Sequence, residues 1–406
     1  MIELLAPVGN MEKLKTAIYF GADACYFAGK QFGLRAFSDN FDLDEMKVAV
    51  DYCHSHNVKA YITINILAKN SDFAELKNYV KHLEKIGVDA VIVSDIGVID
   101  FIRKHAPKLV IHVSTQANVT NKYSARFLVD MGVKRIILAR ELSLEEIKEI
   151  RDFIPEDIEL ETFVHGAMCI SYSGRCLLSN YLTGRESNRG ACVQACRWEY
   201  AIREKHRKGD YYEIQEDDRG TYILNSKDMC MIEHIDKIRD AGVVSFKIEG
   251  RMKSPYYVAT VVNAYRRAID KMNNSNKYTC DKELIDELEK ASHRRYTTGF
   301  FLGEPNKEYL ESSMPVQTHE FMAVVLEDQK DGKVLVEMRN RFKVGETLEI
   351  LSPNDTFNQQ IIIEKMVDEN GDEVLDANQV QQKLYISTNI NLKAGDILRK
   401  KIEPKK

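Results

Sequence analysis

The sequence lacks any long apolar segment. No apolar run reaches the roughly 18 residues that a membrane-spanning helix needs. The N-terminus from Met1 to Leu5 has neither the basic segment nor the apolar stretch of a signal peptide. These two absences exclude an ordinary membrane or secreted protein and predict a cytoplasmic protein without membrane contacts.

The sequence also lacks an excess of positive charge. It has 57 lysines and arginines against 62 aspartates and glutamates, which gives a formal net charge of −5. A chain of this charge does not attract nucleic acid as a whole, so any such contact must use a local basic patch.

Motifs of several common enzyme classes are missing. No Gly-x-Gly-x-x-Gly follows the first predicted strand, which argues against a dinucleotide-binding open sheet. The chain has no His-Glu-x-x-His of zinc peptidases and no Gly-x-Ser-x-Gly of serine hydrolases. These absences do not exclude a cysteine peptidase, so a peptidase remains an alternative function.

Short apolar runs alternate with amphipathic segments through about residue 270. The runs predict eight strands, at Glu3–Pro7, Ala24–Phe27, Lys59–Ile66, Ala90–Ser94, Val110–Thr115, Arg135–Ala139, Ile158–His165 and Val244–Gly250. Eight strand–helix units predict an α/β protein with a (β/α)8 TIM-type barrel, whose chemistry lies at the C-terminal ends of its strands.

Helical periodicity and capping signals support the same fold. Asp42 precedes Glu45, and Ser143 precedes Glu146, with the spacing of a capping box that satisfies free backbone N–H groups at a helix start. Helical segments are predicted at Met11–Phe20, Leu43–His54 and Phe73–Ile86.

A second, smaller domain is predicted after about residue 310. Short strands separated by turn signals predict a small antiparallel β-barrel at 315–402, following a barrel domain at 1–310 with an insertion at about 166–243. The basic tail from Arg399 to Lys406 is interpreted as a solubilising end. The predicted strands are Phe321–Leu326, Lys333–Met338, Thr347–Leu351, Gln360–Met366 and Leu384–Ser387.

Five of the eight cysteines lie between positions 169 and 230. In a cytosolic chain such clustering indicates a metal site or catalysis before it indicates disulfides. The spacing does not separate zinc from an iron–sulfur cluster, and buried structural cysteines or a nucleophilic cysteine near His165 remain alternatives. The clustered residues are Cys169, Cys176, Cys192, Cys196 and Cys230.

Polar side chains alternate along two of the predicted barrel strands. On a regular strand Glu161 and His165 share one face with Phe163, and Lys247, Glu249 and Arg251 share another. Polar groups at the C-terminal end of a barrel strand predict catalytic residues, and the alternative is an ion-pair layer inside the barrel. The lysine and arginine could bind a carboxylate-bearing small molecule or a phosphate. Similar alternation near other strand ends involves Thr63, Asn65, Ser114 and Gln116.

Two basic segments interleaved with aromatic residues are candidates for RNA contacts. One lies in the insertion, near Tyr181 and Trp198, and the other surrounds Tyr296. Cationic side chains can bind phosphates, and aromatic rings can stack on bases. Such segments are nevertheless often only solvated surface. The candidate arginines are Arg185, Arg189, Arg197, Arg294 and Arg295.

Several motifs together resemble peptidase family U32. The signature-like segment runs from Glu161 through His165-Gly166-Ala167-Met168-Cys169 to Gly174-Arg175-Cys176 and Ser179. Further similar segments are Glu3-Leu-Leu-Ala-Pro7, Gly21-Ala-Asp23, Asn225-Ser-Lys227-Asp228-Met-Cys230, Lys247-Ile-Glu249-Gly250-Arg251 and His293-Arg294-Arg295-Tyr296. The resemblance covers nearly the whole chain, including the small C-terminal domain.

The resemblance implies a function and a cofactor. The family is named for collagenase-like proteolysis, but its better-understood members are hydroxylation factors for RNA bases or quinone precursors with a [4Fe-4S] cluster on four cysteines. The chain most resembles the branch that forms 5-hydroxyuridine at the tRNA wobble position, where prephenate is implicated as a small-molecule requirement. The ligands implied are Cys169, Cys176 and Cys192, with Cys196 preferred over Cys230 as the fourth because of its short spacing.

These observations lead to the hypothesis of a cytoplasmic tRNA uridine hydroxylase. Chemistry on a base requires that the base leave the stack, and the barrel mouth is the expected place for it. The alternatives are a U32-type peptidase and a non-catalytic RNA-binding scaffold. The expected partners are tRNA and a small carboxylate-bearing molecule, and the sequence does not indicate the oligomeric state.

Overall fold

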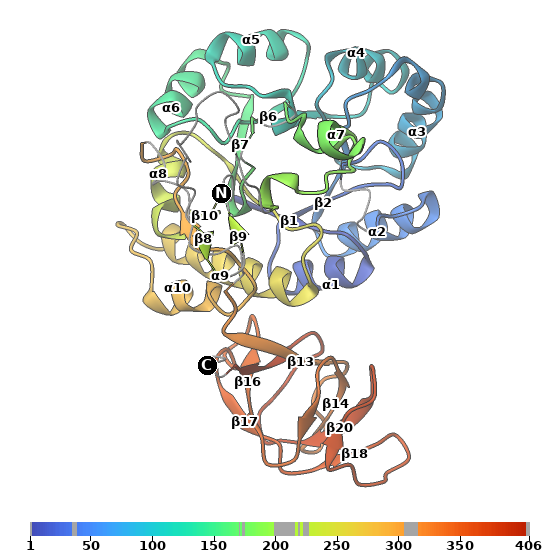
Figure 1. The fold of residues 1–406 in the computed structure, drawn as a ribbon, viewed down its shortest axis with the longest axis vertical. Coiled ribbons are helices and arrows are strands. Elements are labelled where there is room, and N and C mark those ends of the chain that lie inside the picture. Colours follow the sequence, from blue (N-terminus) through green and yellow to red (C-terminus); the bar gives the residue numbers. More distant parts are fainter. Residues whose placement is uncertain are drawn as a thin grey trace, which may run out of the picture.

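The computed structural model describes residues 2–34, 39–169, 171–172, 175–198, 216–217, 220–221, 227–303 and 316–402. Figure 1 shows an α/β barrel, coloured from blue to yellow, above a smaller orange to red sheet. Among the described residues no helix is long and apolar enough to cross a membrane.

Eight parallel strands close into a barrel. β11 pairs with β1 on one side, through Glu3 and Ser245, and with β7 on the other, through Ser245 and Glu161. The predicted (β/α)8 fold is therefore confirmed. The barrel strands are β1 (Glu3–Pro7), β2 (Ala24–Phe27), β3 (Lys59–Ile64), β4 (Ala90–Val93), β5 (Ile111–Val113), β6 (Arg135–Ile137), β7 (Glu159–Ala167) and β11 (Ser245–Ile248).

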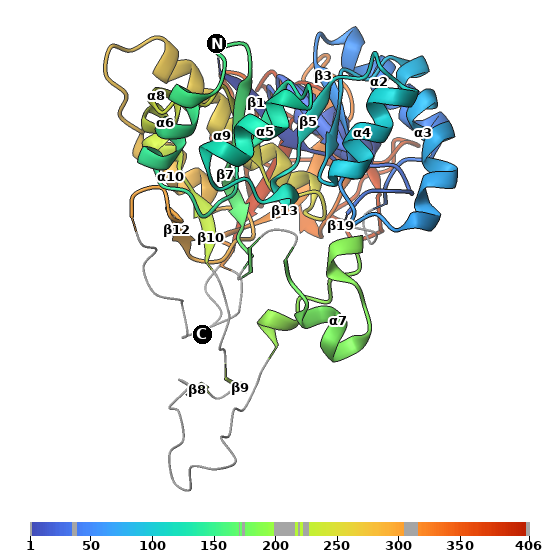
Figure 2. The ribbon, with the colours of Figure 1, turned by 90° about the horizontal axis from the view of Figure 1, so that it is seen from above.

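Helices form a ring around the barrel strands in Figure 1, and Figure 2 shows the same helices from the side. Both predicted capping boxes are present, Asp42 with Glu45 and Ser143 with Glu146. The helices of the ring bury one apolar face against the strands. They are α1 (Met11–Tyr19), α2 (Leu43–Ser55), α3 (Phe73–Ile86), α4 (Ile96–His105), α5 (Lys122–Asp130), α6 (Leu144–Phe153), α8 (Ile235–Asp240), α9 (Pro255–Asn273) and α10 (Lys282–Leu288).

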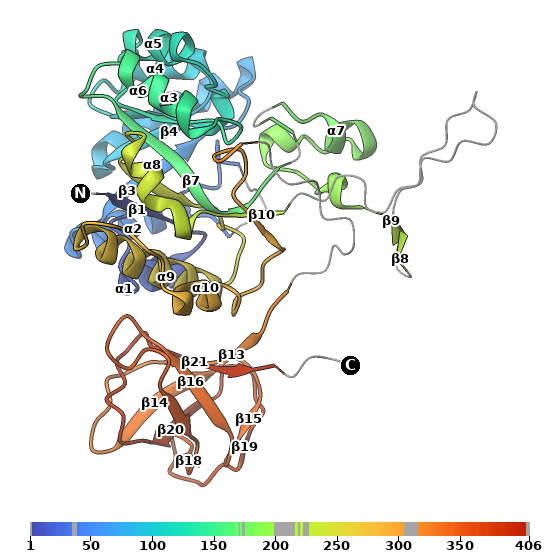
Figure 3. The same ribbon diagram turned by 90° about the vertical axis from the view of Figure 1, so that its left-hand side faces the viewer.

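The sheet continues beyond the barrel at β7. β10 (Asp228–Cys230) pairs antiparallel with the end of β7, and β12 (Tyr296–Thr297) pairs parallel with β10. Between β7 and β10 the insertion contains α7 (Leu178–Thr183), β8 (Glu216–Asp217) and β9 (Gly220–Thr221). Figure 3 shows α7 beyond the end of β7, away from the ring of helices. The insertion thus starts at the C-terminal end of a barrel strand.

The C-terminal sheet is antiparallel and encloses its own apolar core. Its strand order is β17-β16-β21-β13-β14-β20-β18. These strands are β13 (His319–Val325), β14 (Lys333–Met338), β16 (Thr347–Leu351), β17 (Gln360–Ile362), β18 (Met366–Val367), β20 (Lys383–Ser387) and β21 (Ile397–Lys401). A separate pair is formed by β15 (Phe342–Lys343) and β19 (Asp376–Ala377). The predicted boundary at 310–315 falls on residues outside the described part of the chain.

Two predictions for this sheet are wrong. The segment Gln360–Met366 is not one strand, because β17 pairs with β16 whereas β18 pairs with β20. The tail interpreted as a solubilising end contains β21, which pairs with both β13 and β16. Arg399 on β21 is fully buried, so this part of the tail is structural.

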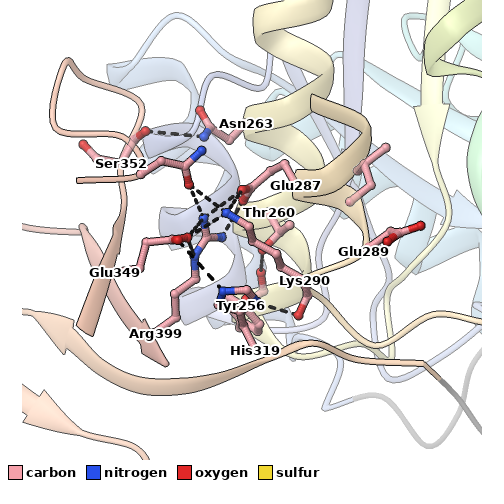
Figure 4. Close-up of polar contacts among 12 residues, drawn as sticks. Tyr256, Thr260, Asn263, Glu287, Glu289, Lys290, His319, Glu349, Ser352 and Arg399 are labelled. Carbon is pink, nitrogen blue, oxygen red and sulfur yellow. Dashed lines mark hydrogen bonds and ion pairs between the residues drawn. The ribbon is translucent and has the colours of Figure 1, made fainter. Parts of the chain in front are cut away.

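Arg399 joins the C-terminal sheet to the barrel. Its guanidinium forms ion pairs with Glu287 of α10, at 2.5 Å from Nη1 to Oε1, and with Glu349 of β16, at 2.6 Å from Nη2 to Oε1. Lys290 follows α10 and lies 2.7 Å from Glu349. Figure 4 shows Arg399 between the two carboxylates. We call Glu287, Lys290, Glu349 and Arg399 the contact cluster.

Candidate active site at the barrel mouth

A layer of buried charges lies near the N-terminal ends of the barrel strands. Arg135 of β6 lies 2.5 Å from Glu3 of β1 and 3.0 Å from Glu161 of β7, measured between Nη1 and the nearest carboxylate oxygens. Glu161 also accepts a hydrogen bond from Lys247 Nζ at 2.7 Å. Burial alone would raise the pKa of Glu3, but Arg135 lowers it below its usual value. We call Glu3, Arg135, Glu161 and Lys247 the floor cluster.

The floor cluster changes the interpretation of Glu161. The residue was predicted to be catalytic, but it is fully buried and its two carboxylate oxygens are bound by Arg135 and Lys247. It belongs to an ion-pair layer inside the barrel, which was the alternative considered for it.

A cavity of about 80 Å³ lies above this layer, and we call it the mouth cavity. Lys247, Glu249 and Arg251 all line it. They meet there because the C-terminal ends of parallel strands face the same end of the barrel. Their catalytic roles stay predictions. Other polar side chains that line the cavity are Thr63, Asn65, Ser114 and Gln116.

The mouth cavity has more cationic than anionic side chains. Arg140, Lys247 and Arg251 line it together with one carboxylate, that of Glu249. Lys247 Nζ lies 4.4 Å from the centroid of the Tyr26 ring, and Tyr26 Oη donates to Glu249 Oε2 at 3.2 Å. A buried guanidinium and ammonium together favour an anionic ligand such as a carboxylate.

His165 does not face the mouth cavity. The pairing of β7 with β11 shifts between Lys247 and Ile248, so His165 is opposite Ile248 and turns away from the barrel interior. Its ring packs instead against Tyr265 and Tyr296, at centroid distances of 5.4 and 5.3 Å. The predicted shared face with Glu161 is therefore wrong for His165.

The surroundings of His165 make it a neutral group. It is 1% exposed, and neither ring nitrogen has a hydrogen-bond partner among the described residues. Burial lowers the pKa of His165 to about 3, although Asp228 opposes the shift. A histidine of this kind is uncharged at neutral pH and does not contact the mouth cavity, so the structure gives no support to its predicted catalytic role.

The chain turns sharply where β7 leads to the cysteines. Gly166 has a φ of +109°, and a Cβ atom there would lie 2.5 Å from the carbonyl oxygen of Glu249. Only glycine allows this close approach of β7 to the segment after β11. The approach brings the beginning of the insertion beside the mouth cavity.

Four of the clustered cysteines line one cavity of about 130 Å³, which we call the cysteine cavity. The four are Cys169, Cys176, Cys192 and Cys196. Cys230 does not line it; its Sγ lies 3.9 Å from Tyr265 Oη, beside His165. Leu34, Gln116 and Arg140 line both the cysteine cavity and the mouth cavity, so the two cavities are neighbours.

The insertion is fastened to the barrel by ion pairs. Arg189 binds Asp72 with both ends of its guanidinium, at 2.8 and 3.1 Å, and donates to Leu67 O at 2.7 Å. Lys69 pairs with Glu186 at 2.9 Å. Arg189 was a predicted RNA contact, but its charge is neutralised by Asp72 and its role here is to hold the insertion.

The other predicted RNA contacts differ in their exposure. Arg294 is buried and pairs with Asp228, at 2.6 Å from Nη2 to Oδ1, so it does not present its charge to a phosphate. Arg295 and Arg185 are exposed. The side chain of Arg197 lies outside the described part of the chain. The burial of Arg294 and its pair with Asp228 argue against a phosphate contact, and the prediction stays open for Arg185, Arg197 and Arg295.

Arg140 is a residue of the site that the sequence reasoning missed. It lines both cavities, and its Nη1 donates to Ala167 O at 3.2 Å. A signal was present, because Arg140 directly follows the predicted strand Arg135–Ala139 and a polar residue at the C-terminal end of a barrel strand indicates a site.

Comparison with known proteins agrees with this architecture. The sequence profile of "Peptidase family U32" matches residues 9–311, and that of its "C-terminal domain" matches residues 317–399. The chain is 39% identical to tRNA hydroxylation protein P1 of Bacillus subtilis, over 98% of this chain and 94% of that protein. It is 34% identical to the 23S rRNA 5-hydroxycytidine C2501 synthase of Escherichia coli, over 74% of this chain and 45% of that protein.

A relative with a different name completes the comparison. The chain is 33% identical to a protein named collagenase from Porphyromonas gingivalis, over 74% of each chain. Relatives with similar sequences thus have names of two functional classes, RNA hydroxylation and proteolysis. Because the two profiles together span nearly the whole sequence, the chain belongs to peptidase family U32.

Proposed function

We propose that this chain hydroxylates C5 of the wobble uridine of tRNA. The observation that carries the proposal is the contact between two cavities, a polar one at the barrel mouth and one lined by four cysteines, which share Gln116 and Arg140. The names of the relatives support it, since one is a tRNA hydroxylation protein and another is named for 5-hydroxycytidine in rRNA.

We propose that the cysteines hold an iron–sulfur cluster and not a single zinc ion. Four thiols around a cavity of about 130 Å³ suit a cofactor of several atoms, which thiolates hold at its corners. When bound, such a cluster supplies one-electron redox chemistry. We propose Cys169, Cys176, Cys192 and Cys196 as its ligands, with Cys230 as the competing fourth ligand.

The mouth cavity provides the polar groups that the substrates need. Thr63, Asn65, Ser114 and Gln116 offer donors and acceptors for the edge of an extruded base. Arg140 and Arg251 supply positive charge for a small carboxylate-bearing molecule such as prephenate, and Lys247, whose ammonium also pairs with Glu161, adds a donor. We propose that this acid binds deep in the cavity and that the uridine enters above it.

Nucleoside analysis tests the function. In a strain that lacks this gene and its paralogues, mass spectrometry of tRNA nucleosides should find no 5-hydroxyuridine derivatives. The wild-type gene should restore them, and Cys169→Ser should not. Normal hydroxylation in that strain, together with peptide cleavage by metal-replete protein, would favour the peptidase. If neither activity appears, the RNA-binding scaffold becomes the better hypothesis.

Iron analysis tests the ligand assignment separately. Anaerobically purified protein should contain iron and sulfide, and Cys169→Ser and Cys176→Ser should lose both. Cys25→Ser is the control, because Cys25 is buried in the barrel core. Comparing Cys196→Ser with Cys230→Ser identifies the fourth ligand. Stoichiometric zinc without iron would contradict the proposed cofactor.

A further inference from the structure

A groove with a volume of about 690 Å³ lies beside the mouth cavity. Its walls come from the segments after β3, β4 and β5, from α5 and from the insertion. Asn65 and Gln116 line both the groove and the mouth cavity, and Asn188 lines both the groove and the cysteine cavity. A chain that enters the mouth cavity can therefore continue into the groove.

Two aromatic side chains line the α5 wall of the groove. Tyr123 and Phe127 are four residues apart, so they lie on the same face of the helix. They are 69% and 59% exposed. Large apolar side chains exposed next to one another in a hollow mark a binding surface more often than a solvated one. Aromatic rings at the surface of a polar groove are suited to stacking with a planar ligand.

The rest of the groove is rich in side-chain amides. Asn65, Gln116, Asn118 and Asn188 all line it. Asn118 has a φ of +58°, and its Oδ1 is buried without a hydrogen-bond partner among the described residues. A buried acceptor without a partner is costly, and a donor from a ligand would satisfy it. Amides present a donor and an acceptor side by side, which is the pattern that recognises the edge of a nucleobase.

The charged residues of the groove agree with an RNA ligand. Arg175 from the insertion lines it and is exposed. The carboxylate of Asp95 also lines it, but this group is the N-cap of α4 and accepts a hydrogen bond from Val98 N at 3.0 Å. Arg175 thus places a positive charge on the side of the groove next to the cysteines.

We propose that the groove binds the nucleotide next to the modified uridine in the RNA strand. Its base stacks on Tyr123 and Phe127, the Asn118 amide contacts the base edge, and Arg175 contacts the phosphate. The proposal rests on the proposed function, because a neighbouring nucleotide is needed only if a uridine enters the mouth cavity. A peptide would use backbone hydrogen bonds and side-chain pockets, and it has less need of two exposed aromatic rings and four amides.

Equilibrium binding of an anticodon stem-loop to the full-length, cluster-loaded protein tests the groove. The RNA carries 2-aminopurine on one side of the wobble uridine, and a second RNA carries it on the other side. The double variant Tyr123→Ala/Phe127→Ala should bind about 5- to 100-fold more weakly, as expected for loss of base stacking. The fluorescence quenching that the wild type causes at one of the two positions should disappear.

Salt dependence separates stacking from charge. The aromatic variant should keep the slope of log affinity against log salt, since no phosphate contact is lost. Arg175→Ala should reduce that slope by about one. Leu375→Ala is the control, because Leu375 is 65% exposed, lies just before β19 in the C-terminal domain and should change neither quantity.

The possible failures are distinguishable. If the aromatic variant binds and quenches like the wild type while the wild type restores 5-hydroxyuridine in cells, the groove proposal is wrong and the proposed function stands. If the wild type neither binds the stem-loop nor restores the nucleoside, both are wrong. If a gelatin peptide binds the wild type and loses affinity in the aromatic variant, whereas RNA binding is unchanged, the groove is a peptide site.

Discussion

Two buried ion clusters of similar composition serve different parts of this molecule. Each contains one arginine, two glutamates and one lysine: Glu3, Arg135, Glu161 and Lys247 in the floor cluster, and Glu287, Lys290, Glu349 and Arg399 in the contact cluster. The floor cluster connects strands of a single closed barrel. The contact cluster connects a helix of the barrel with two strands of a separate sheet.

The difference between the clusters lies in what can relax when a partner is removed. The interior of a closed barrel is packed on all sides, so the fully buried carboxylate of Glu161 has no route to water when Arg135 is removed. A contact between a helix and a separate sheet can open slightly and admit water to the remaining charges. The floor cluster also extends to the site through Lys247, which lines the mouth cavity. Clusters of the same residue types therefore have different roles. The floor cluster supports the barrel rigidly, and the contact cluster holds the C-terminal sheet against the barrel.

The largest effect is expected from Arg135→Met. The substitution removes the main partner of the fully buried Glu161 and of the partly buried Glu3, and breaking a buried pair typically lowers the free energy of unfolding by about 3–5 kcal/mol. Urea unfolding of the full-length protein, followed by circular dichroism, measures the loss. Arg126→Met is the matched control, since Arg126 forms an exposed pair with Asp130 and should change the stability by less than about 1 kcal/mol. Equal effects of the two variants would contradict a structural role for the floor cluster.

A smaller effect is expected from Arg399→Met. Lys290 remains within 3.1 Å of Glu287 and 2.7 Å of Glu349, so the two carboxylates keep one cation. We expect a loss of about 3 kcal/mol, at the lower end of the range for broken buried pairs. Hydrogen exchange should accelerate in β16 and β21 and remain unchanged in β1 and β7. Faster exchange throughout the barrel would show that the C-terminal sheet is part of the same cooperative unit.

The two clusters also show what the sequence can and cannot predict. The eight barrel strands are recognisable because each is a short apolar run, and the capping boxes at Asp42 and Ser143 need only local information. β21 was missed because its polar residues look like a solvated tail. The burial of Arg399 depends on Glu287, which is 112 residues away in the chain. No local pattern contains such a partner.

The candidate site, like the fold, could be predicted only in part from the sequence. The alternating pattern predicted that Lys247, Glu249 and Arg251 share one face. All three line one cavity, because β11 and the segment after it keep the alternation of a strand. The same reasoning failed for His165, since the shifted pairing of β7 with β11 reverses the side to which the residue points. The cysteine spacing indicated a shared site but not the neighbouring mouth cavity, whose position depends on Gly166 and on the path of the insertion.

Lys247→Met tests whether the floor cluster and the site are connected. Glu161 retains Arg135 at 3.0 Å, so the loss of stability should be about 2 kcal/mol, the value of one hydrogen bond to a charged group. If Lys247 also binds the small acid, formation of 5-hydroxyuridine should fall strongly while the iron content stays at the wild-type level. Normal hydroxylation by this variant would restrict Lys247 to a structural role.

The smallest effect concerns pH and again compares the clusters. His319 lies 3.9 Å from Glu349 in the contact cluster, and burial lowers its pKa to about 4 although Glu349 opposes the shift. The unfolded chain therefore takes up a proton near the usual histidine pKa of 6.5, before the folded chain does. Stability should fall as the pH decreases from 6.5 to 4, and the histidine contributes about 1 kcal/mol of this loss.

His319→Gln should flatten this part of the stability curve. Unfolding midpoints at pH 7 and pH 5 measure the difference, and His56→Gln is the control because His56 is exposed. Burial, and then Arg135, also hold the pKa of His112 beside the floor cluster well below its usual value, so its contribution to stability changes with pH in the same direction. Because the contact cluster can admit water without opening the barrel, mild acid should loosen the contact cluster before it loosens the floor cluster. If hydrogen exchange at pH 5 accelerates in β1 and β7 before β16 and β21, the proposed order of stability between the two clusters is reversed.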